Sequence, residues 1–326
     1  MHPCVSVLIP LYNAEKYVAE SIESALAQTW PNIEIIVVDD GSKDNSLAIA
    51  KSFENRGVKV FNQSNNGAAA ARNRALQESK GEYIQFLDAD DILQPNKIAL
   101  QMEALSEELP GTIATCAWGK FTNYPIQEVT LFSNPTKTGE SPNIYSKPID
   151  WLCCSWGGNG HMLIHAWLVP RKIIHLAGEW NELLSTNDDG EYFCRIVLAS
   201  KKIKFCDNTC VYYRTHDGDR VSNPNSSVKI ASLFQSLVHC KSHLLSKEDS
   251  ITTRRAVADL FQDFIYSFYP FHSVWLIKAE KIVIDMGGSN LRYKYNKGIL
   301  KIFEVLLGWK TAVRIKFYLK SLILKI

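Results

Sequence analysis

A short apolar run that stops at three carboxylates is the feature that most constrains how this chain can fold. Tyr83-Ile84-Gln85-Phe86-Leu87 is followed at once by Asp88-Ala89-Asp90-Asp91. Continuous apolar residues over this length are typical of a strand that is buried on both faces of a parallel sheet. Ligands of such sheets bind beyond the carboxyl ends of the strands. We therefore expect Asp88 and Asp90 to stand in a ligand crevice, although a solvated acidic turn has the same signature.

Strand and helix patterns alternate through residues 1–110. Apolar strand-like runs cover residues 5–12, 33–38, 58–61 and 83–87, and helical patterns lie between them, the last in an Ala-rich stretch after Asn66-Gly67. Alternation of this kind predicts a mostly parallel sheet with helices on both faces.

The first turn argues against two common nucleotide-binding classes. After the first strand the chain reads Pro10-Leu11-Tyr12-Asn13, so the Gly-x-Gly-x-x-Gly turn of dinucleotide-binding dehydrogenases is missing, and there is no Walker lysine motif. A phosphate would instead be held by a metal at Asp90 and by Arg72, which lies early in a helix whose N-terminus favours anions. A solvated helix face is the alternative for Arg72.

The composition is that of an ordinary globular protein. The 326 residues are 46% hydrophobic and 21% charged, with a net charge of +2, so we expect no nucleic-acid partner. The first residues lead directly into an apolar strand without a secretion signal, and no run reaches the roughly 18 apolar residues of a spanning helix. These features predict a cytoplasmic protein whose eight cysteines are reduced and mostly buried.

Four motifs within residues 5–91 resemble those of family-two glycosyltransferases, which have the GT-A fold. They are Val5–Asn13, Val37–Ser42, Asn66-Gly67 with Arg72–Ala75, and Phe86–Asp91. The resemblance implies a nucleotide-diphosphate sugar as the donor, with UDP as the first expectation, and a Mn²⁺ or Mg²⁺ cofactor.

The resemblance also implies a role for each donor-site residue. Pro10 and Tyr12 would lie beside the base, and Asp39 would accept a hydrogen bond from it. Arg72 would face the diphosphate, Asp88 would contact the ribose or the metal, and Asp90 would bind the metal. The other residues assigned to the nucleotide-sugar site are Leu11, Asn66, Gly67 and Ala89. Without the resemblance, Tyr12 reads as a core aromatic residue and Asp39 as a helix cap.

The catalytic segment of the family resembles residues 180–195 of this chain. Where the family has a Glu-Asp pair, this chain has Asp188-Asp189. The resemblance implies Asp189 as the general base, with Asp188, Glu191 and Trp180 near the acceptor. Such a base must remove the proton of the attacking hydroxyl, which contributes about 10²–10⁴-fold to the rate. For Asp188, an acidic helix N-terminus is the alternative interpretation.

Histidines provide one further expected ligand. Val211–His216 resembles the Tyr-Arg-x-His motif of the family, which implies His216 as a metal or diphosphate ligand. Structural roles are expected for His161 and His165. Residues 122–150 carry four prolines and are expected to form a long loop.

Residues 226–326 lie outside the resemblance and have helical patterns. Residues 299–326 mix six basic side chains with apolar ones and contain a single acid, Glu304. This pattern is compatible with a basic amphipathic helix on an anionic membrane. The resemblance implies a class of enzymes with many lipid-linked acceptors, and this favours a location at the inner face of the cell membrane. The alternative is packing against the chain's own catalytic domain or against a second subunit of a homo-oligomer.

We therefore expect an α/β protein of GT-A type with a C-terminal helical region. Residues 1–110 would bind the nucleotide sugar, residues 111–225 the acceptor, and residues 226–326 would be helical. The expected activity is inverting, metal-dependent transfer of a sugar to a hydroxyl of a glycan or a lipid-linked acceptor. A catalytically inactive protein of the same fold that binds nucleotide sugars or glycans stays open as the alternative.

Overall fold

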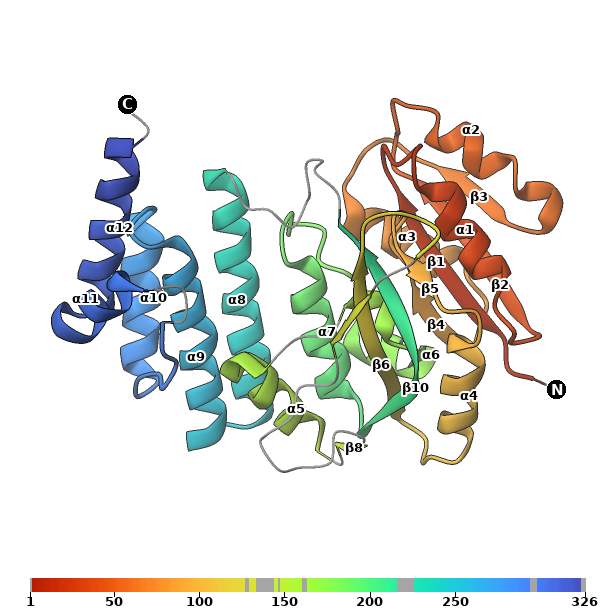
Figure 1. Cartoon of the computed structure of the whole chain (residues 1–326). Helices are drawn as coiled ribbons and strands as arrows, with labels where there is room; N and C mark the ends of the chain where they lie inside the picture. Colours follow the sequence, from red (N-terminus) through yellow and green to blue (C-terminus); the bar gives the residue numbers. More distant parts are fainter. Residues whose placement is uncertain are drawn as a thin grey trace. The chain divides into compact units, whose positions relative to one another are not determined.

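The computed structural model describes residues 2–126, 129–132, 144–145, 147–159, 163–215, 226–293 and 298–323. The chain divides into two compact units (Figure 1). The first comprises Met1–Ser155 and Asn159–Lys247, and the second comprises Trp156–Gly158 and Glu248–Ile326. The expected division of the first part near residue 110 stays a prediction.

The first sheet has the strand order β3-β2-β1-β4-β9. Its strands are β1 Val5–Leu11, β2 Ile33–Asp39, β3 Lys59–Asn62, β4 Tyr83–Phe86 and β9 Val169–Pro170. β1 pairs in parallel with β2 and β4, β2 pairs in parallel with β3, and β9 is antiparallel to β4. The first four strands therefore end at the same edge, as the sequence predicted.

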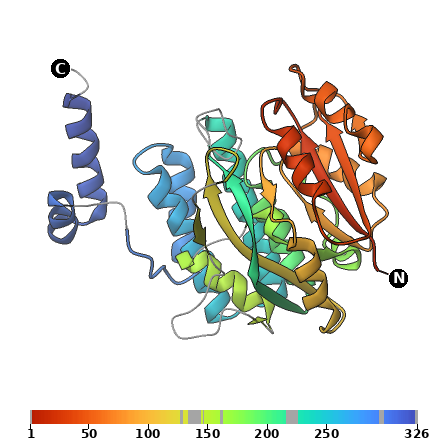
Figure 2. The same ribbon diagram turned by 45° about the vertical axis from the view of Figure 1, so that its right-hand side comes forward.

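Short helices connect these strands. They are α1 Val18–Leu26, α2 Ser46–Lys51, a 3₁₀ turn Glu54–Arg56, and α3 Ala68–Glu78. α1 and α2 lie beside β1, β2 and β3 (Figures 1 and 2). Val5, Val7 and Ile9 alternate along β1 and enter one core together with Val18 and Ile22 of α1. This burial on one face matches the period of two in a strand and the apolar stripe of a helix.

The second sheet extends the first unit. Its order is β5-β10-β6-β7, with β8 also paired to β10. The strands are β5 Ile92–Leu93, β6 Thr112–Phe121, β7 Thr130–Phe132, β8 Ile144–Tyr145 and β10 Lys202–Arg214. Helix α4, Lys97–Ser106, packs against β6 and β10. Reciprocal backbone hydrogen bonds of 3.0 and 2.9 Å between Ala114 and Leu168 join the two sheets.

One sequence expectation for this part needs correction. The segment 122–150, expected to be one long loop, contains β7, β8 and the start of α5, Pro148–Cys154, among its described residues. The long strand β10 has an irregularity between Cys206 and Cys210. β10 pairs with β6 along its length, and this pairing makes it one element.

The remaining helices of the first unit surround α7. They are α6 Arg171–Ala177, α7 Asp188–Ala199 and α8 Ser227–Lys247, with a 3₁₀ turn at Ile164–Ala166. A further helical turn, Ser155–Asn159, includes Trp156–Gly158 of the second unit. α7 packs against α6 and α8. α8, the first helix of the region expected to be helical, thus belongs to the first unit together with the sheets.

The second unit is helical. It contains α9 Ile251–Phe268, α10 Ser273–Asp285, α11 Ile299–Leu307 and α12 Trp309–Ile323. Gly308, at φ 81°, separates α11 from α12, so the basic stretch expected as one helix is two. Among the described residues, no helix is both long and apolar enough to cross a membrane.

Candidate functional site

The turn after β1 places an exposed aromatic side chain beside the end of β2. Tyr12 is 46% exposed, so it is not a core aromatic residue. Pro10 is half-buried and Leu11 is buried. The next residue, Asn13, accepts a hydrogen bond from the Lys43 backbone N–H at 2.8 Å, and its own N–H donates to Ser42 Oγ at 3.0 Å. These contacts hold the turns after β1 and β2 together.

Asp39 ends β2 with one carboxylate oxygen in use and one without a partner. Its Oδ2 accepts a hydrogen bond from the Ser42 N–H at 3.1 Å. Its Oδ1 is buried and has no hydrogen-bond partner among the described residues. A buried acceptor without a donor is costly. Asp39 therefore offers an acceptor suited to an N–H donor of a ligand.

Asp40 is a site residue to which sequence reasoning gave no role. Its carboxylate accepts hydrogen bonds from the backbone N–H groups of Asn66 and Gly67 at 2.9 and 2.8 Å, and from the Gln63 side chain. Gly67 has φ 95° and ψ 164°, a region essentially restricted to glycine. Asp40 thus fixes the turn that starts α3, where the sequence predicted Asn66 and Gly67 to meet the donor. The Asp39-Asp40 pair before Gly41 is the sequence signal that could have indicated this role of Asp40.

Arg72 is buried rather than open to a ligand. Its guanidinium pairs with Asp88 Oδ1 at 2.9 Å and with Asp188 Oδ2 at 2.8 Å, and its side chain is 8% exposed. It also lies over the Trp180 ring, 4.5 Å from the centroid. Arg72 was expected to face a diphosphate or a solvated helix face. In the structure it instead joins the β4 end to the start of α7.

The turn after β4 brings together a group of possible metal ligands. Asp88, Asp91 and His165 each offer one atom within 4.8 Å of the others. Asp91 Oδ2 and both ring nitrogens of His165 are buried without a well-formed hydrogen bond to any described residue, although Nδ1 lies 3.2 Å from Asp91 Oδ2. Carboxylate oxygens with one imidazole nitrogen fit Mn²⁺. His165, expected to be structural, thus lies beside the acidic turn.

The charges of this group are strongly perturbed. Burial lowers the pKa of His165 to about 4, against the opposing effect of Asp88. Burial, with Asp90 and Asp88 nearby, raises the pKa of Asp91 well above its usual value. Because an uncharged imidazole is the form that binds metals, the low pKa of His165 keeps it competent as a ligand.

The other two predicted metal ligands have different outcomes. Asp90 is half-buried beside the buried Ala89, and its backbone oxygen accepts a hydrogen bond from Arg214 Nε at 2.8 Å. His216 lies outside the described residues. Arg214, which sequence reasoning left without a role, also donates its backbone N–H to Asp91 Oδ1 at 2.8 Å and ion-pairs with Glu20. Through these contacts, Arg214 holds the end of β10 against the acidic turn.

Asp189 lies at the first turn of α7 with an elevated pKa. Burial and the neighbouring Asp188 raise its pKa to about 6, while Arg72 opposes the shift. Its Oδ1 accepts a hydrogen bond from the Gly190 N–H at 2.8 Å. A half-buried carboxylate with a pKa near 6 can take a proton near neutral pH.

Glu191 and Trp180, assigned to the acceptor, are both buried at 2% exposure. Burial raises the pKa of Glu191, but hydrogen bonds from His243 and Arg195 outweigh it and hold the value at about 2. The Trp180 ring stacks on Tyr192 at a centroid distance of 3.9 Å. Because both side chains are buried, neither has exposed surface for an acceptor to contact. In the structure both instead pack against neighbouring residues of the site.

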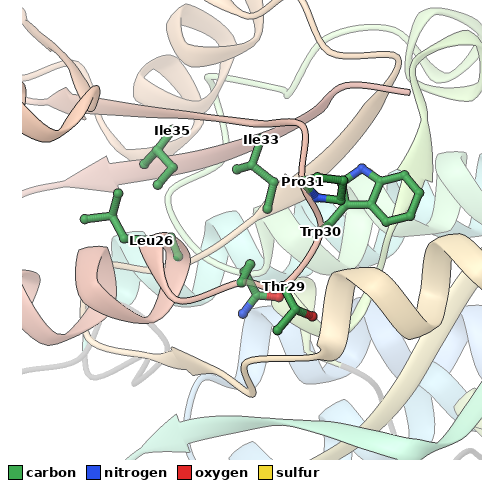
Figure 3. Close-up of a pocket in the computed structure, with 8 residues that line it drawn as sticks. Leu26, Thr29, Trp30, Pro31, Ile33 and Ile35 are labelled. Atoms are coloured by element: carbon green, nitrogen blue, oxygen red, sulfur yellow. The ribbon is translucent and has the colours of Figure 1, made fainter. Parts of the chain in front are cut away.

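A pocket of about 330 Å³ lies at the other edge of the first sheet. It is lined by the end of α1 and the start of β2, with Leu26, Trp30 and Ile33 among its walls (Figure 3). This edge carries the amino ends of the parallel strands and lies opposite the edge that carries the acidic turn. The pocket is therefore separate from the candidate site.

Comparisons with known proteins show which family this chain is similar to. The family described as "Glycosyl transferase family 2" matches residues 6–158. Glycosyltransferase GlyG of Streptococcus pneumoniae serotype 4 is 33% identical over 226 residues, which cover 67% of this chain and 73% of GlyG. An uncharacterized glycosyltransferase of Rickettsia felis is 33% identical over 258 residues, 76% of this chain but 40% of that protein.

Solved structures support the fold. Residues 1–349 of S. aureus TarS, solved in complex with UDP-GlcNAc, align with a TM-score of 0.67 and 19% identity, covering 86% of this chain and 81% of that chain. The expected α/β architecture of GT-A type is confirmed. Since GlyG shares a third of its aligned residues with this chain over most of its own length, this chain belongs to glycosyltransferase family 2.

Proposed function

We propose that this chain is an inverting glycosyltransferase that moves a sugar from a nucleotide diphosphate to an acceptor hydroxyl, with Asp189 as the general base. The observation that carries the proposal is the position and pKa of Asp189. Its carboxylate, with a pKa of about 6, lies beside Asp188, which Arg72 joins to Asp88 at the strand ends. An ionisable base beside the crevice is what attack by a hydroxyl requires.

The donor would lie across the ends of β1, β2 and β4. Tyr12 supplies an exposed ring for a base, and the free Oδ1 of Asp39 can accept a base N–H. Among solved structures, TarS was obtained with UDP-GlcNAc, which supports a UDP-sugar as the donor. We assign Arg72 to holding Asp88 and Asp188 in place, because both of its ion pairs are to protein carboxylates.

A Mn²⁺ or Mg²⁺ ion would be held at the turn after β4. Asp88, Asp91 and His165 are the described residues that come together there, and Asp90 and His216 remain predicted ligands. When bound, the cation would offset the charge that develops on the departing diphosphate. Asp189, on α7, would meanwhile hold the proton taken from the acceptor hydroxyl.

The acceptor would be a glycan or a lipid-linked sugar, as in polysaccharide biosynthesis. Support for a membrane surface comes from the second unit. Ile302, Val305 and Leu306 of α11 and Tyr318 of α12 are exposed, and α12 also carries the exposed basic Lys310, Arg314 and Lys316. Apolar side chains flanked by cations match an anionic bilayer. Packing against a second copy of the chain would cover the same residues.

Replacing Asp189 by Asn tests the proposed function. Asn keeps the size and a hydrogen-bonding oxygen but cannot take a proton, so transfer should fall by about two to four decades. Donor binding, measured by calorimetry, should survive because the donor contacts come from the strand ends. The product should have inverted anomeric configuration by NMR.

Asp207→Asn, at an exposed carboxylate of β10, is the matched control and should keep full activity. Near-full transfer by Asp189→Asn, or a product of retained configuration, would contradict the base assignment. Donor binding by the native chain with no transfer to any acceptor, and no donor hydrolysis, would favour the binding-protein alternative.

A further inference from the structure

We propose that α8 positions the catalytic turn, through one helix face formed by Ser232, Ser236, Cys240 and His243. The inference rests on the proposed role of Asp189 in that turn. Spacings of four, four and three residues put these side chains on one side of a helix. Each of them contacts the segment 185–191, which carries Asp188 and Asp189.

The turn depends on an unfavourable backbone conformation. Asn187, directly before α7, has φ 57° and ψ 31°. This left-handed conformation is uncommon for residues other than glycine, and asparagine is among those that tolerate it best. Because α7 begins at Asp188, the backbone at Asn187 sets the direction in which Asp188 and Asp189 leave the turn. Asn187 makes no side-chain cap to the helix, so other contacts must hold it.

Two serines of α8 supply those contacts. Ser236 Oγ donates to the Asn187 backbone oxygen at 3.0 Å and accepts from Asn187 Nδ2 at 2.5 Å. Ser232 Oγ accepts the backbone N–H groups of Ser185 and Thr186 at 2.8 and 3.2 Å. These hydroxyls thus bind three consecutive residues of the turn, and Ser236 grips Asn187 by both its backbone and its side chain.

The next position along α8 closes the first helical turn of α7. Cys240 Sγ lies 3.8 Å from the Gly190 backbone oxygen, to which it can donate. At Gly190 itself, a Cβ would lie 2.4 Å from Asn187 Oδ1 and 2.8 Å from its Cγ. The missing side chain leaves the room that Asn187 needs to fold back toward Ser236.

The contact of His243 joins α8 to the other end of the segment 185–191. His243 Nε2 lies 2.9 Å from Glu191 Oε1, and Arg195 binds the same carboxylate through two hydrogen bonds of 2.8 and 2.9 Å. Arg195 also donates to the backbone oxygens of Ala177 and Glu179, directly before Trp180. Through these contacts, α8 supports both the turn that carries Asp189 and the segment that carries Trp180.

Ser236→Ala in the full chain tests the proposal, with Ser242→Ala, an exposed serine of the same helix, as the matched control. We expect kcat to fall about 10- to 100-fold, because small misplacements of a reacting group have effects of this size. KM for the donor should stay within about twofold of the native value, since the predicted donor contacts lie at the strand ends. Amide hydrogen exchange should become faster at residues 185–191.

Two further variants separate positioning from mere folding. Ser236→Thr keeps the hydroxyl and should restore most of kcat. Ser232→Ala, at a half-buried position, should lower kcat and speed exchange at residues 185–186 even if Ser236→Ala folds poorly. The proposal fails if Ser236→Ala and Ser232→Ala match Ser242→Ala in kcat and exchange, or if Ser236→Thr restores stability without restoring kcat.

The exchange measurement also distinguishes this proposal from the proposed function. If Asp189→Asn keeps full transfer, the base role is wrong, and the loss of kcat in Ser236→Ala loses its explanation. Faster exchange at residues 185–191 in Ser236→Ala would still establish that α8 holds the turn. Unchanged exchange there would overturn the inference whatever Asp189 does.

Discussion

At the scale of single residues, the ionised carboxylate of Asp189 lowers the stability of the folded chain, although the proposed chemistry needs this form. Asp189 is held beside Asp188, and its pKa rises to about 6 because burial disfavours its charge. Arg72 offsets part of this cost through its ion pairs with Asp88 and Asp188. A group that is well placed as a base at neutral pH is therefore one whose ionised form destabilises the folded chain.

Asp189→Asn should accordingly stabilise the protein in a pH-dependent way. The folded-state pKa of about 6 lies above the ordinary aspartate value of 3.8, so the folded state binds the proton more tightly. The contribution of protonated Asp189 to the unfolding free energy is fully present below about pH 4 and is lost as the pH rises through about 6. At pH 8 the variant should gain about 1–3 kcal/mol in unfolding free energy.

Denaturant unfolding at pH 8 and pH 4 measures this difference. The gain should be absent at pH 4, where the aspartate is protonated in the folded state. A gain of equal size at both pH values would show that charge is not its cause. Loss of stability at pH 8 would contradict the raised pKa.

Asp39 offers a second prediction at this scale. Its Oδ1 should accept a base N–H, so Asp39→Ala should weaken UDP and uridine binding by a similar factor of about 10- to 150-fold, which corresponds to a hydrogen bond to a charged group. Calorimetry with both ligands measures this. A loss seen with UDP alone would assign Asp39 to the diphosphate instead.

At the scale of elements, turns rather than helices or strands carry the site. The turn after β2 is tied to the turn before α3 by Asp40, and the turn after β4 is tied to the end of β10 by Arg214. Gly67 permits the first arrangement through a backbone conformation closed to other residues. Segments distant in the sequence are thus fixed against one another by side chains that bind backbone groups.

The turn after β4 should bind a divalent cation. Asp88→Asn should weaken Mn²⁺ binding at least about tenfold, because a carboxylate ligand is lost from a small donor set. Electron paramagnetic resonance of free Mn²⁺ gives the affinity, with Asp207→Asn as the control. Excess chelator should abolish transfer by the native chain, and undiminished transfer in chelator would remove the metal from the proposed function.

At the scale of the whole molecule, two units of different character share one chain. The first holds both sheets, the candidate site and α8, whereas the described part of the second contains helices α9 to α12 with many exposed apolar side chains. Exposed apolar residues beside basic ones indicate an interaction surface. The proposed membrane role of the second unit can therefore be tested separately from the chemistry in the first.

The full chain should bind anionic vesicles, with affinity falling as salt rises. Reversing Lys310, Arg314 and Lys316 to Glu should abolish sedimentation with phosphatidylglycerol vesicles. Reversing the exposed Lys51, Lys172 and Lys201 of the first unit changes the net charge equally and should leave binding intact. If the native chain ignores such vesicles but sediments as a dimer in the ultracentrifuge, α11 and α12 are an oligomer surface.

Local patterns in the sequence were enough to predict the framework. The apolar run before Asp88 and the alternation of strands and helices predicted a parallel α/β sheet with polar residues at its carboxyl edge. Hydrophobic periodicity determines these features, because each element must bury one face or both. The break at Gly308 was not predicted, since it depends on how the segment packs.

Only the tertiary structure decided which side chains meet at the site. Arg72 reads as a phosphate ligand in the sequence, yet it pairs with two protein carboxylates separated from it by 16 and 116 residues. His165 lies beside Asp91, and α8 lies against the Asp189 turn, across sequence distances that no local pattern spans. A sequence pattern reports what each segment buries, whereas partners brought together by folding determine the charge, the pKa and the orientation of each group.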